Sequence, residues 1–422
     1  MDEKRMELTE TDGAGNVIAT YVSSPTDSKG VCRVDIIDSL QAFASSIAGL
    51  LSSRAVLSSV GVGDATASPT AALLLSIFQD SVGRVATILF ADRFGTALEP
   101  ECKMYRLLAD VLNDCAFVLD CLSPAFPKPI RVVVLSFSSV LRALCGVAAG
   151  SSKASLSAHF ALGSNLGELN AKDSSQETVI SLMGMLVGSL VVYCVTSPLA
   201  TWSTLLALLA IHLETNRRAV RAVSMRTLNR QRATLVYHDL QLGKVPTPGD
   251  ISRQERIFEW DGVLRNAQDK IVGYCSLGSR VDTTLRSVSY RKADAKHSVN
   301  LMNSLWETSV ASLRSRHYAL LIAPAPKGLQ ASVVLERGAS ATDILSAWWQ
   351  ALAMADQPSL FGEAKVGSAE KKASVIDALE STATECATLL RRNQQELVKA
   401  GWDLDTSAIE TKASRRVALG PA

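Results

Sequence analysis

The sequence predicts a mainly α protein in which a membrane-associated multi-helix bundle is followed by a small α+β C-terminal domain. Three observations predict this class: long stretches with apolar residues at helical spacing, two segments almost without charge, and a change after residue 300 to short strand-like runs. The composition agrees, because 47% of the 422 residues are hydrophobic and the mean hydropathy is +0.17. That much apolar surface must be buried in a core or in lipid.

Charge and cysteine usage narrow the classes of protein. The 43 basic and 41 acidic residues nearly balance, which gives a nucleic-acid partner no support. The eight cysteines are scattered without a C-x-x-C pair, which is typical of buried thiols in a reducing compartment. The N-terminus, MDEKRMELTETDGAG, has neither an apolar signal stretch nor an acid-poor, arginine-rich pattern, and no cleaved targeting peptide is visible in it.

We expect four parts along the chain. Residues 1–37 are polar and rich in Gly, Ser, Thr and Asp, which predicts a flexible tail. Residues 38–232 show helical apolar spacing and predict a helical (membrane) domain. Residues 233–299, with the turn sequence KVPTPGD, predict a linker and helices, and residues 300–422 predict an α+β domain with a terminal helix.

The first helical pattern begins after Asp38 and continues through Leu40, Phe43 and Ile47 until Gly61 ends it. Small Ser and Ala residues occupy the rest of its surface. Such residues permit close helix packing, in a core or in lipid.

The second pattern, residues 69–95, starts at Pro69 and stops at Gly95. Its middle carries Asp80 and Arg84, an i,i+4 pair able to neutralise itself on one face.

The third pattern, KMYRLLADVLNDCAFVLDCLSP, places charged residues in one row of an otherwise apolar helix. Arg106, Asp110 and Asp114 follow one another at i,i+4 spacing, with Asn113 beside them. Such a row is either the solvated face of an ordinary helix or the polar lining of a helix bundle.

Two later segments are long enough to cross a membrane. Residues 132–152 are apolar apart from Arg142, and residues 178–213 contain no Asp, Glu, Lys or Arg. Because a span needs about 20 residues, the first segment crosses once, and the second holds two short helices or one kinked span. The next residues, 216–232, contain six arginines and no acid, which favours a cytosol-side flank. We therefore expect an integral or tightly associated membrane protein, with a buried soluble helical core as the alternative.

The polar passage NAKDSSQET, residues 170–178, lies directly before the charge-free segment. Ser174 followed three residues later by Glu177 is typical of a capping box, and this favours a helix start there. The second interpretation is an acid–base group beside His159 and Lys172. Its carboxylates would be Glu168, Asp173 and Glu177.

The motifs of common reaction centres are absent from the sequence. It contains no P-loop, G-x-S-x-G, H-E-x-x-H or dinucleotide fingerprint, and VGVGDA lacks the third glycine of the latter. The five histidines show no metal-ligand spacing. We expect no enzyme activity, no metal and no cofactor.

The C-terminal part follows a different pattern. HYALLIAPAP and LQASVVLERG are strand-like runs around Pro326 to Gly328, and SATDILSAWWQALAMA predicts a helix with Ser340 as its N-cap. An amphipathic helix, KASVIDALESTATECATLLRRNQQELVKAG, ends at Gly401.

Several blocks between about residues 38 and 249 resemble, in order, the root UV-B sensitive family. They include DSLQAF, H-F-A, N-x-x-E-L-x-A-K and the string S-Q-E-T-x-x-x-L-x-G-M-x-x-G. The region HYALLIAPAPKGLQASVVLERGASATDILSAWWQAL is similar, more loosely, to the C-terminal domain of that family. The approach to DSLQAF departs from the family pattern, because the family usually has a proline- and tyrosine-containing approach there, whereas this chain has SSPTDSKGVCRVDII. No function is placed before Asp38.

The resemblance implies a helical, membrane-associated protein linked to vitamin B6 homeostasis and photoprotection, and in plants to seedling development and auxin transport. The candidate functional polar residues are Asp80, Arg84, Arg106, Asp110, Asn113, Asp114, His159, Asn165, Lys172, Gln176 and Glu177. The resemblance also includes Asp38 and Gln41. Gly184 and Gly188 are expected to pack helices closely.

Three functions compete at this point. The first is a non-enzymatic membrane scaffold or homeostasis factor that acts through partners. The alternative is a transporter-like helix bundle that moves a small polar metabolite such as a B6 vitamer, because charged residues within apolar helices are typically functional. An enzyme acting on a B6 vitamer, with Lys172 as its lysine, is disfavoured because the large α/β domain of such enzymes is missing. The expected partners are the membrane, a protein partner or an oligomer with members of the same family, and a B6-vitamer ligand.

Overall fold

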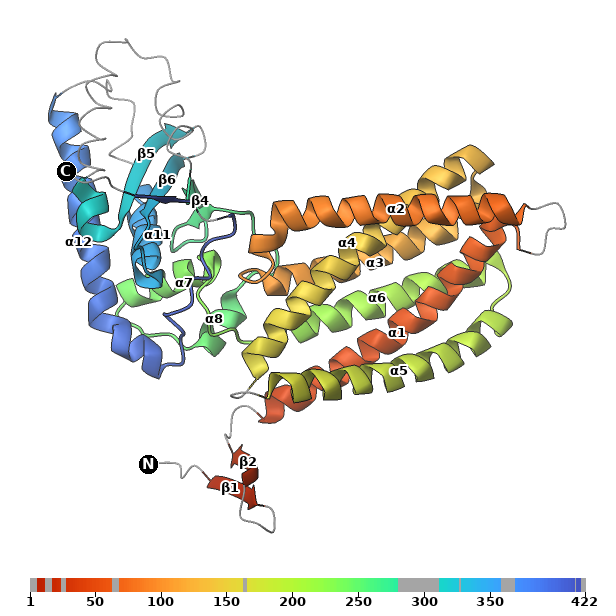
Figure 1. The fold of residues 1–422 in the computed structure, drawn as a ribbon. Coiled ribbons are helices and arrows are strands. Elements are labelled where there is room, and N and C mark those ends of the chain that lie inside the picture. The colour runs from red at the N-terminus through yellow and green to blue at the C-terminus, as the bar shows by residue number, and fades with distance from the viewer. Residues whose placement is uncertain are drawn as a thin grey trace. The chain divides into compact units, whose positions relative to one another are not determined.

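The computed structural model describes residues 6–11, 17–23, 28–62, 68–161, 165–279, 311–325, 328–357, 369–413 and 415–418. The chain is mainly α, as predicted, with a small sheet in its C-terminal part (Figure 1). It divides into two compact units. Unit 1 contains Met1–Thr87, Arg106–Ala149 and Ala161–Val223, and unit 2 contains the remaining segments, Ile88–Tyr105, Gly150–Phe160 and Ser224–Ala422.

Six long helices follow one another between residues 28 and 222. They are α1 (Ser28–Val60), α2 (Pro69–Phe94), α3 (Cys102–Leu122), α4 (Lys128–Phe160), α5 (Leu166–Cys194) and α6 (Pro198–Ala222). In unit 1, α1 packs lengthwise against α5 and α6 (Figure 1). The breaker residues act as predicted: Gly61 follows α1 with a positive φ of 92°, and Ser197 caps α6 by accepting from the Ala200 amide, with Pro198 next in the chain.

Helix α5 begins earlier than the sequence indicated. The capping-box interpretation of Ser174 to Glu177 is wrong, because α5 starts at Leu166 and these residues lie inside it. The Ser175 hydroxyl donates to the Ala171 carbonyl at 2.8 Å, and the Thr178 hydroxyl donates to the Ser174 carbonyl at 2.8 Å. The hydroxyl groups bond to the preceding turn, and this polar passage therefore continues the helix.

Four helices are long and apolar enough to cross a membrane: Ser39–Val60, Pro69–Ala97, Lys128–Phe160 and Leu166–Cys194. They contain the predicted span at residues 132–152 and the first half of the charge-free segment. Little of this apolar surface is covered by protein, since only 6% of the most apolar window of α2 and 11% of that of α5 is buried. The exposed apolar side chains of α2 and α5 include Leu73, Leu74, Ile77, Phe78, Val85, Leu182, Leu186, Leu190 and Tyr193.

Unit 2 is built on a mixed sheet. Its strands are β3 (Val263–Arg265), β4 (Ile271–Leu277), β5 (Tyr318–Ala325) and β6 (Gly328–Glu336), in the order β3-β4-β6-β5, with β7 (Arg416–Val417) beside β6. The β4–β6 and β6–β7 pairs are parallel and the others antiparallel. The sheet thus takes two strands from the range 233–299, where the sequence indicated a linker and helices. The β3 strand is only three residues long, too short for a periodic signal.

Unit 2 also contains the helices α7 (Arg230–Gln241), α8 (Pro248–Gln254), α11 (Ala341–Ala355) and α12 (Ala369–Lys399). Trp348 and Trp349 of α11 are fully buried, and their indole N–H groups donate to Thr234 Oγ1 at 3.0 Å and to the Ala233 carbonyl at 2.9 Å. Aromatic burial with satisfied N–H groups makes α11 the centre of this core.

Residues 1–37 also differ from the flexible tail indicated by composition. Strands β1 (Met6–Thr11) and β2 (Val17–Ser23) pair as an antiparallel hairpin, and α1 already begins at Ser28. The second strand, VIATYVS, is rich in β-branched residues, and this local preference outweighs the polar average of the segment.

Ser340 caps α11 as predicted and forms a capping box. Its hydroxyl accepts from the Asp343 amide at 3.2 Å, and Asp343 accepts from the Ser340 amide at 2.9 Å. A Ser340→Ala variant is expected to lose about 1 kcal/mol of unfolding free energy, measured by chemical denaturation with tryptophan fluorescence. Ser381→Ala, an exposed serine within α12, is the matched control, and an equal loss there would contradict the capping role.

Candidate functional site

The charged row of α3 is buried against α1 and α6 in unit 1. The resulting polar cluster consists of Gln41, Arg106, Asp110, Asp114, His212 and Asn216. Apart from Arg106, each of these residues is 5% exposed or less. Of the two interpretations of this row, a solvated face is therefore excluded and the lining of a helix bundle is correct.

Asp110 lies at the centre of the polar cluster. Its Oδ2 accepts from the Gln41 amide of α1 and from Asn216 Nδ2 of α6, the latter at 2.5 Å. Arg106, one turn earlier, brings a guanidinium nitrogen to 3.9 Å from the other carboxylate oxygen and donates to Gln41 Oε1 at 3.3 Å. A single carboxylate thus joins three helices.

His212 connects the two aspartates of α3. Its Nδ1 lies 2.7 Å from Asp114 Oδ1, and its Nε2 lies 3.4 Å from Asp110 Oδ2 and 3.5 Å from the Gln41 amide nitrogen. Each ring nitrogen therefore faces an acid. The imidazole is 2% exposed, so its hydrogen-bonding groups must be satisfied within the bundle.

One acceptor of the polar cluster is unsatisfied within the part of the chain that the structure describes. Asp114 Oδ2 is buried and makes no hydrogen bond with any of those residues. An ionised carboxylate in this setting needs a donor or a cation to offset its burial. The arrangement is suited to bind a proton, a cationic group or a hydroxyl of a small ligand. Among the residues that the structure describes, no group of three His, Cys, Asp or Glu side chains is arranged to hold a metal ion.

A second buried polar contact lies between α1, α3 and α4. Arg142, the single charge of the predicted span at 132–152, pairs with Asp120 and donates to Ser52 Oγ at 3.0 Å. Ser52 in turn donates to Asp120 at 2.7 Å, and the Asp120 side chain is only 1% exposed. The guanidinium also lies 5.7 Å from the centre of the Phe117 ring. These contacts explain a charge in this apolar helix by internal pairing.

The remaining predicted residues lie outside the polar cluster. Asp80 and Arg84 are exposed on α2, and Asn113 is half-buried on α3. The ring of His159 contacts Phe160 at the end of α4. The other four belong to the first three turns of α5 and its N-cap, and they are Asn165, Lys172, Gln176 and Glu177.

The α5 residues face mostly outward. Lys172 pairs with Glu168 at 2.5 Å on the surface, and Gln176 lies 3.5 Å from the Ser39 hydroxyl. Of the acid–base group considered for this passage, Glu168, Lys172, Asp173 and Glu177 lie on α5 and His159 lies on α4, and that interpretation stays a prediction. Asp38, also part of the resemblance, has a side chain outside the described residues.

Gly184 and Gly188 are buried on the face of α5 that contacts α1. A Cβ atom at Gly184 would lie 2.7 Å from Ser46 Cβ and 3.0 Å from the Phe43 carbonyl oxygen. A Cβ atom at Gly188 would lie 2.7 Å from Leu50 Cδ1. Both glycines thus permit close approach of the two helices.

Two members of the polar cluster, His212 and Asn216, were missed as site residues. They continue a buried stripe of α6 that begins with Leu205 and Leu209. This stripe has the i, i+4, i+7, i+11 spacing of one helix face, and a polar pair on an apolar face is the available signal. Nothing local, however, indicates that this face meets the charged row of α3.

The six arginines of residues 216–232, three of which lie in the last turns of α6, do not form a uniform basic flank. Arg230 and Arg232 are buried in unit 2, where Arg230 pairs with Asp261 and Arg232 lies 3.5 Å from Glu255. Arg217 and Arg218 both bind Glu214 at 2.7 Å. Basic charge exposed at this end of α6 is therefore smaller than the sequence count indicates.

Arg232 belongs to a buried ionic cluster of unit 2 made of Glu101, Lys103, Arg232 and Glu255. Lys103 Nζ lies 2.7 Å from Glu255 and donates to Ser252 at 3.0 Å. Burial is the largest influence on both neighbours: it raises the pKa of Glu101 and lowers the pKa of Lys103, although Glu255 opposes the latter. The cluster therefore depends on its internal pairing.

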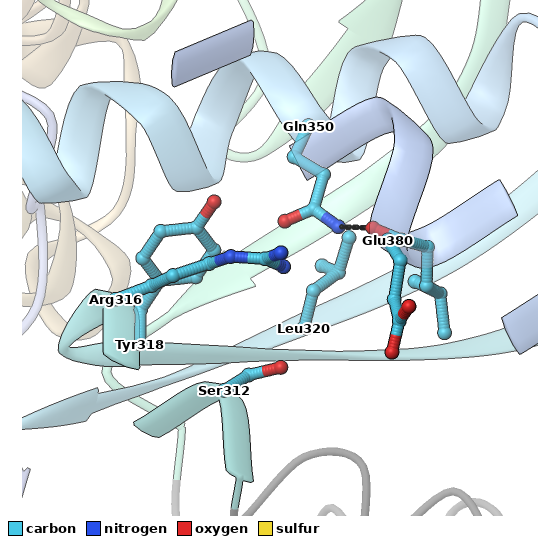
Figure 2. Close-up of a pocket in the computed structure, with 7 residues that line it drawn as sticks. Ser312, Arg316, Tyr318, Leu320, Gln350 and Glu380 are labelled. Carbon is cyan, nitrogen blue, oxygen red and sulfur yellow. Dashed lines mark hydrogen bonds between the residues drawn. The ribbon is translucent and has the colours of Figure 1, made fainter. Parts of the chain in front are cut away.

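Unit 2 also contains a small surface pocket between β5, α11 and α12 (Figure 2). The Arg316 side chain extends into it beside Tyr318, and Glu380 lies on the other side (Figure 2). Gln350 Nε2 donates a hydrogen bond to the Leu379 carbonyl at 2.8 Å, and the Gln350 side chain forms one wall of the pocket. With one cation and one anion at its edge, the pocket suits a small polar group.

A family model described as "Vitamin B6 photo-protection and homoeostasis domain" matches residues 30–242, which include the whole polar cluster. The chain is 39% identical over 226 residues to "RUS family member 1" of Dictyostelium discoideum, covering 52% of this chain and 43% of that protein. It is 33% identical over 322 residues to "Protein root UVB sensitive 3" of Arabidopsis thaliana, covering 76% of this chain and 70% of that protein. "Protein root UVB sensitive 2, chloroplastic", also from Arabidopsis, is 26% identical over 58% of this chain and 56% of its own length. No solved structure matches the chain.

Proposed function

Because the chain belongs to the root UV-B sensitive family and carries its vitamin B6 photo-protection and homoeostasis domain, we propose that it is an integral membrane protein whose polar cluster binds a B6 vitamer and passes it across the bilayer. The observation that carries this proposal is the burial of Asp110, Asp114 and His212 inside a bundle whose outer helices expose apolar side chains. Ionisable groups inside a membrane are costly, and they typically mark a substrate or ion pathway.

The chemistry of the polar cluster fits such a ligand. B6 vitamers share a pyridine nitrogen and a phenolic hydroxyl, the unphosphorylated forms carry a free hydroxymethyl group, and the pyridoxamine forms carry an amine. The two aspartates supply acceptors for hydroxyl and ammonium groups, and Arg106, Gln41 and Asn216 supply donors. A few convergent polar groups in an apolar bundle are the usual composition of a small-molecule site.

The scaffold hypothesis is the second candidate. Two observations favour it: most polar atoms of the cluster are bonded to one another, and unit 2 has its own core of buried aromatic and aliphatic residues. On this hypothesis the polar cluster specifies helix packing. Unit 2 would then bind a protein partner or another member of the family.

Uptake of labelled pyridoxine into liposomes that contain the full chain separates the two candidates. If the chain transports pyridoxine, wild type takes it up and Asp110→Asn does not. The asparagine side chain lacks the negative charge to which donors from α1, α3 and α6 are directed. Asp80→Asn changes an exposed carboxylate of α2 in the same way and is expected to retain uptake. Both variants must stay in the membrane after alkaline carbonate treatment. Wild-type flux no higher than that of empty liposomes would reject transport and favour the scaffold.

A further inference from the structure

The polar cluster contains one acid more than its fixed cation balances. Asp110 and Asp114 are the anions, and Arg106 is the permanent cation. With a neutral His212 the cluster keeps one negative charge, and with an imidazolium it becomes neutral. An uncompensated charge is expensive in a buried site, and this cost favours a bound proton.

Among the described residues, those printed in contact with His212 include no cation. From α3 it faces Asp110 and Asp114, with Arg106 beyond them, and from α1 it faces the uncharged Gln41. On α4, the Cys145 thiol interacts electrostatically with Asp110, Arg106 and Asp114. The Arg142 guanidinium of α4 is already paired with Asp120. The contacts of Asn216 on α6 are to Asp110 and the Arg106 carbonyl.

A second, independent observation points to proton exchange. Asp114 Oδ2 is buried without a hydrogen-bond partner among the described residues, on the same carboxylate whose Oδ1 binds His212 Nδ1. An open carboxylate oxygen next to an imidazole is an acceptor position for a hydronium ion or a protonated ligand group.

On the basis of the proposed transport function, we infer that Asp110, His212 and Asp114 form a proton-binding site and that a proton bound there travels with the transported B6 vitamer. The proton comes from water on one side of the membrane, is held on the imidazole, and is returned to water on the other side. No bond other than N–H forms or breaks on the protein.

The geometry also links proton binding to helix packing. With a proton on Nδ1 alone, His212 donates to Asp114, and its Nε2 accepts from the Gln41 amide, 3.5 Å away. A second proton turns Nε2 into a donor toward Asp110, 3.4 Å away, and Gln41 must then release the ring. Protonation therefore changes a contact between α1 and α6, which is the type of change that drives alternation between two states.

The proton site is tested first without any transport. The full chain, labelled with ¹⁵N-histidine and placed in nanodiscs, is titrated by NMR across roughly pH 5–9, and the His212 signal is assigned by its loss in His212→Gln. The signal is expected to change between imidazolium and neutral forms. Its midpoint should move to lower pH in Asp114→Asn, which removes one flanking anion, and stay in place in Asp80→Asn. A His212 signal that does not titrate, or a midpoint unaffected by Asp114→Asn, would overturn the proton site.

Coupling is tested in liposomes loaded with a pH-sensitive dye. With acid outside, pyridoxine entry through wild type is expected to acidify the interior, and no acidification is expected without pyridoxine. Pyridoxine entry without acidification would overturn coupling. If no pyridoxine enters at all, the proposed transport function fails and coupling fails with it, whereas the NMR titration still decides whether the proton site exists.

Discussion

A Glu255→Ala variant is expected to lose about 3–5 kcal/mol of unfolding free energy, the usual effect of removing one partner of a buried ion pair. The Glu255 side chain is 5% exposed, and it neutralises two buried cations. Lys103 lies 2.7 Å from it, and Arg232, whose side chain is 2% exposed, lies 3.5 Å from it. Without the carboxylate both cations stay buried without their partner. The loss is measured by chemical denaturation followed through tryptophan fluorescence.

Two further variants show whether the loss of unfolding free energy arises from buried cations left without their carboxylate. Lys103→Met combined with Glu255→Met replaces the closest pair by apolar groups and is expected to recover the part of the loss that Lys103 causes, while Arg232 stays charged without Glu255. Glu214→Ala removes a carboxylate that also binds two arginines, but on an exposed surface, and it is expected to leave the denaturation midpoint unchanged. Equal losses in the Glu255 and Glu214 variants would show that the buried ionic cluster is not the cause.

A Gly184→Ala variant is expected to destabilise the helical bundle by about 1–3 kcal/mol, because the added methyl overpacks the α1–α5 contact. The new Cβ would lie 2.7 Å from Ser46 Cβ and 3.0 Å from the Phe43 carbonyl oxygen. Neither atom is the end of a flexible side chain, so the helices must move apart. Thermal unfolding of the purified protein in detergent measures the change.

Gly146 of α4 is the matched control, since a Cβ there meets no atom of the described residues within 4 Å. Replacing a helical glycine by alanine raises intrinsic helix propensity by about 1 kcal/mol, and Gly146→Ala is therefore expected to be neutral or stabilising. The same substitution thus has opposite signs at the two positions. A Gly184→Ala variant as stable as Gly146→Ala would contradict the close α1–α5 contact.

The helical elements were predictable where local residues define their ends. Pro69 and Pro198 fix φ at the starts of α2 and α6, Ser197 caps α6, and Gly61 permits the positive φ that follows α1. The start of α5 was not predictable in this way. Hydroxyl side chains at 174–178 fit both a cap and a helix interior, and only their bonds to the preceding turn decide between the two.

The polar cluster was half predictable. The row of Arg106, Asp110 and Asp114 is visible in the sequence because its spacing is local. Its partner His212 lies 98 residues from Asp114, and its contact depends on how α6 packs in the bundle. Strand β4 could not be predicted for the same reason. Its place in the sheet depends on parallel pairing with β6, more than 50 residues later in the chain. Long-range pairing is not encoded in any single window of sequence.

Arg54 of α1 has a consequence for the order in which the protein is assembled during synthesis. It donates to the carbonyls of Val192 and Val195 at the end of α5, at 2.9 Å and 2.7 Å, and to Thr201 Oγ1 at the start of α6. The nearest of these acceptors is 138 residues later in the chain. While the ribosome is still making the intervening helices, α1 is complete but its guanidinium has none of these acceptors. Helix α1 therefore reaches its final bonding only when the α5–α6 hairpin has been translated, and this docking is a late step in biogenesis.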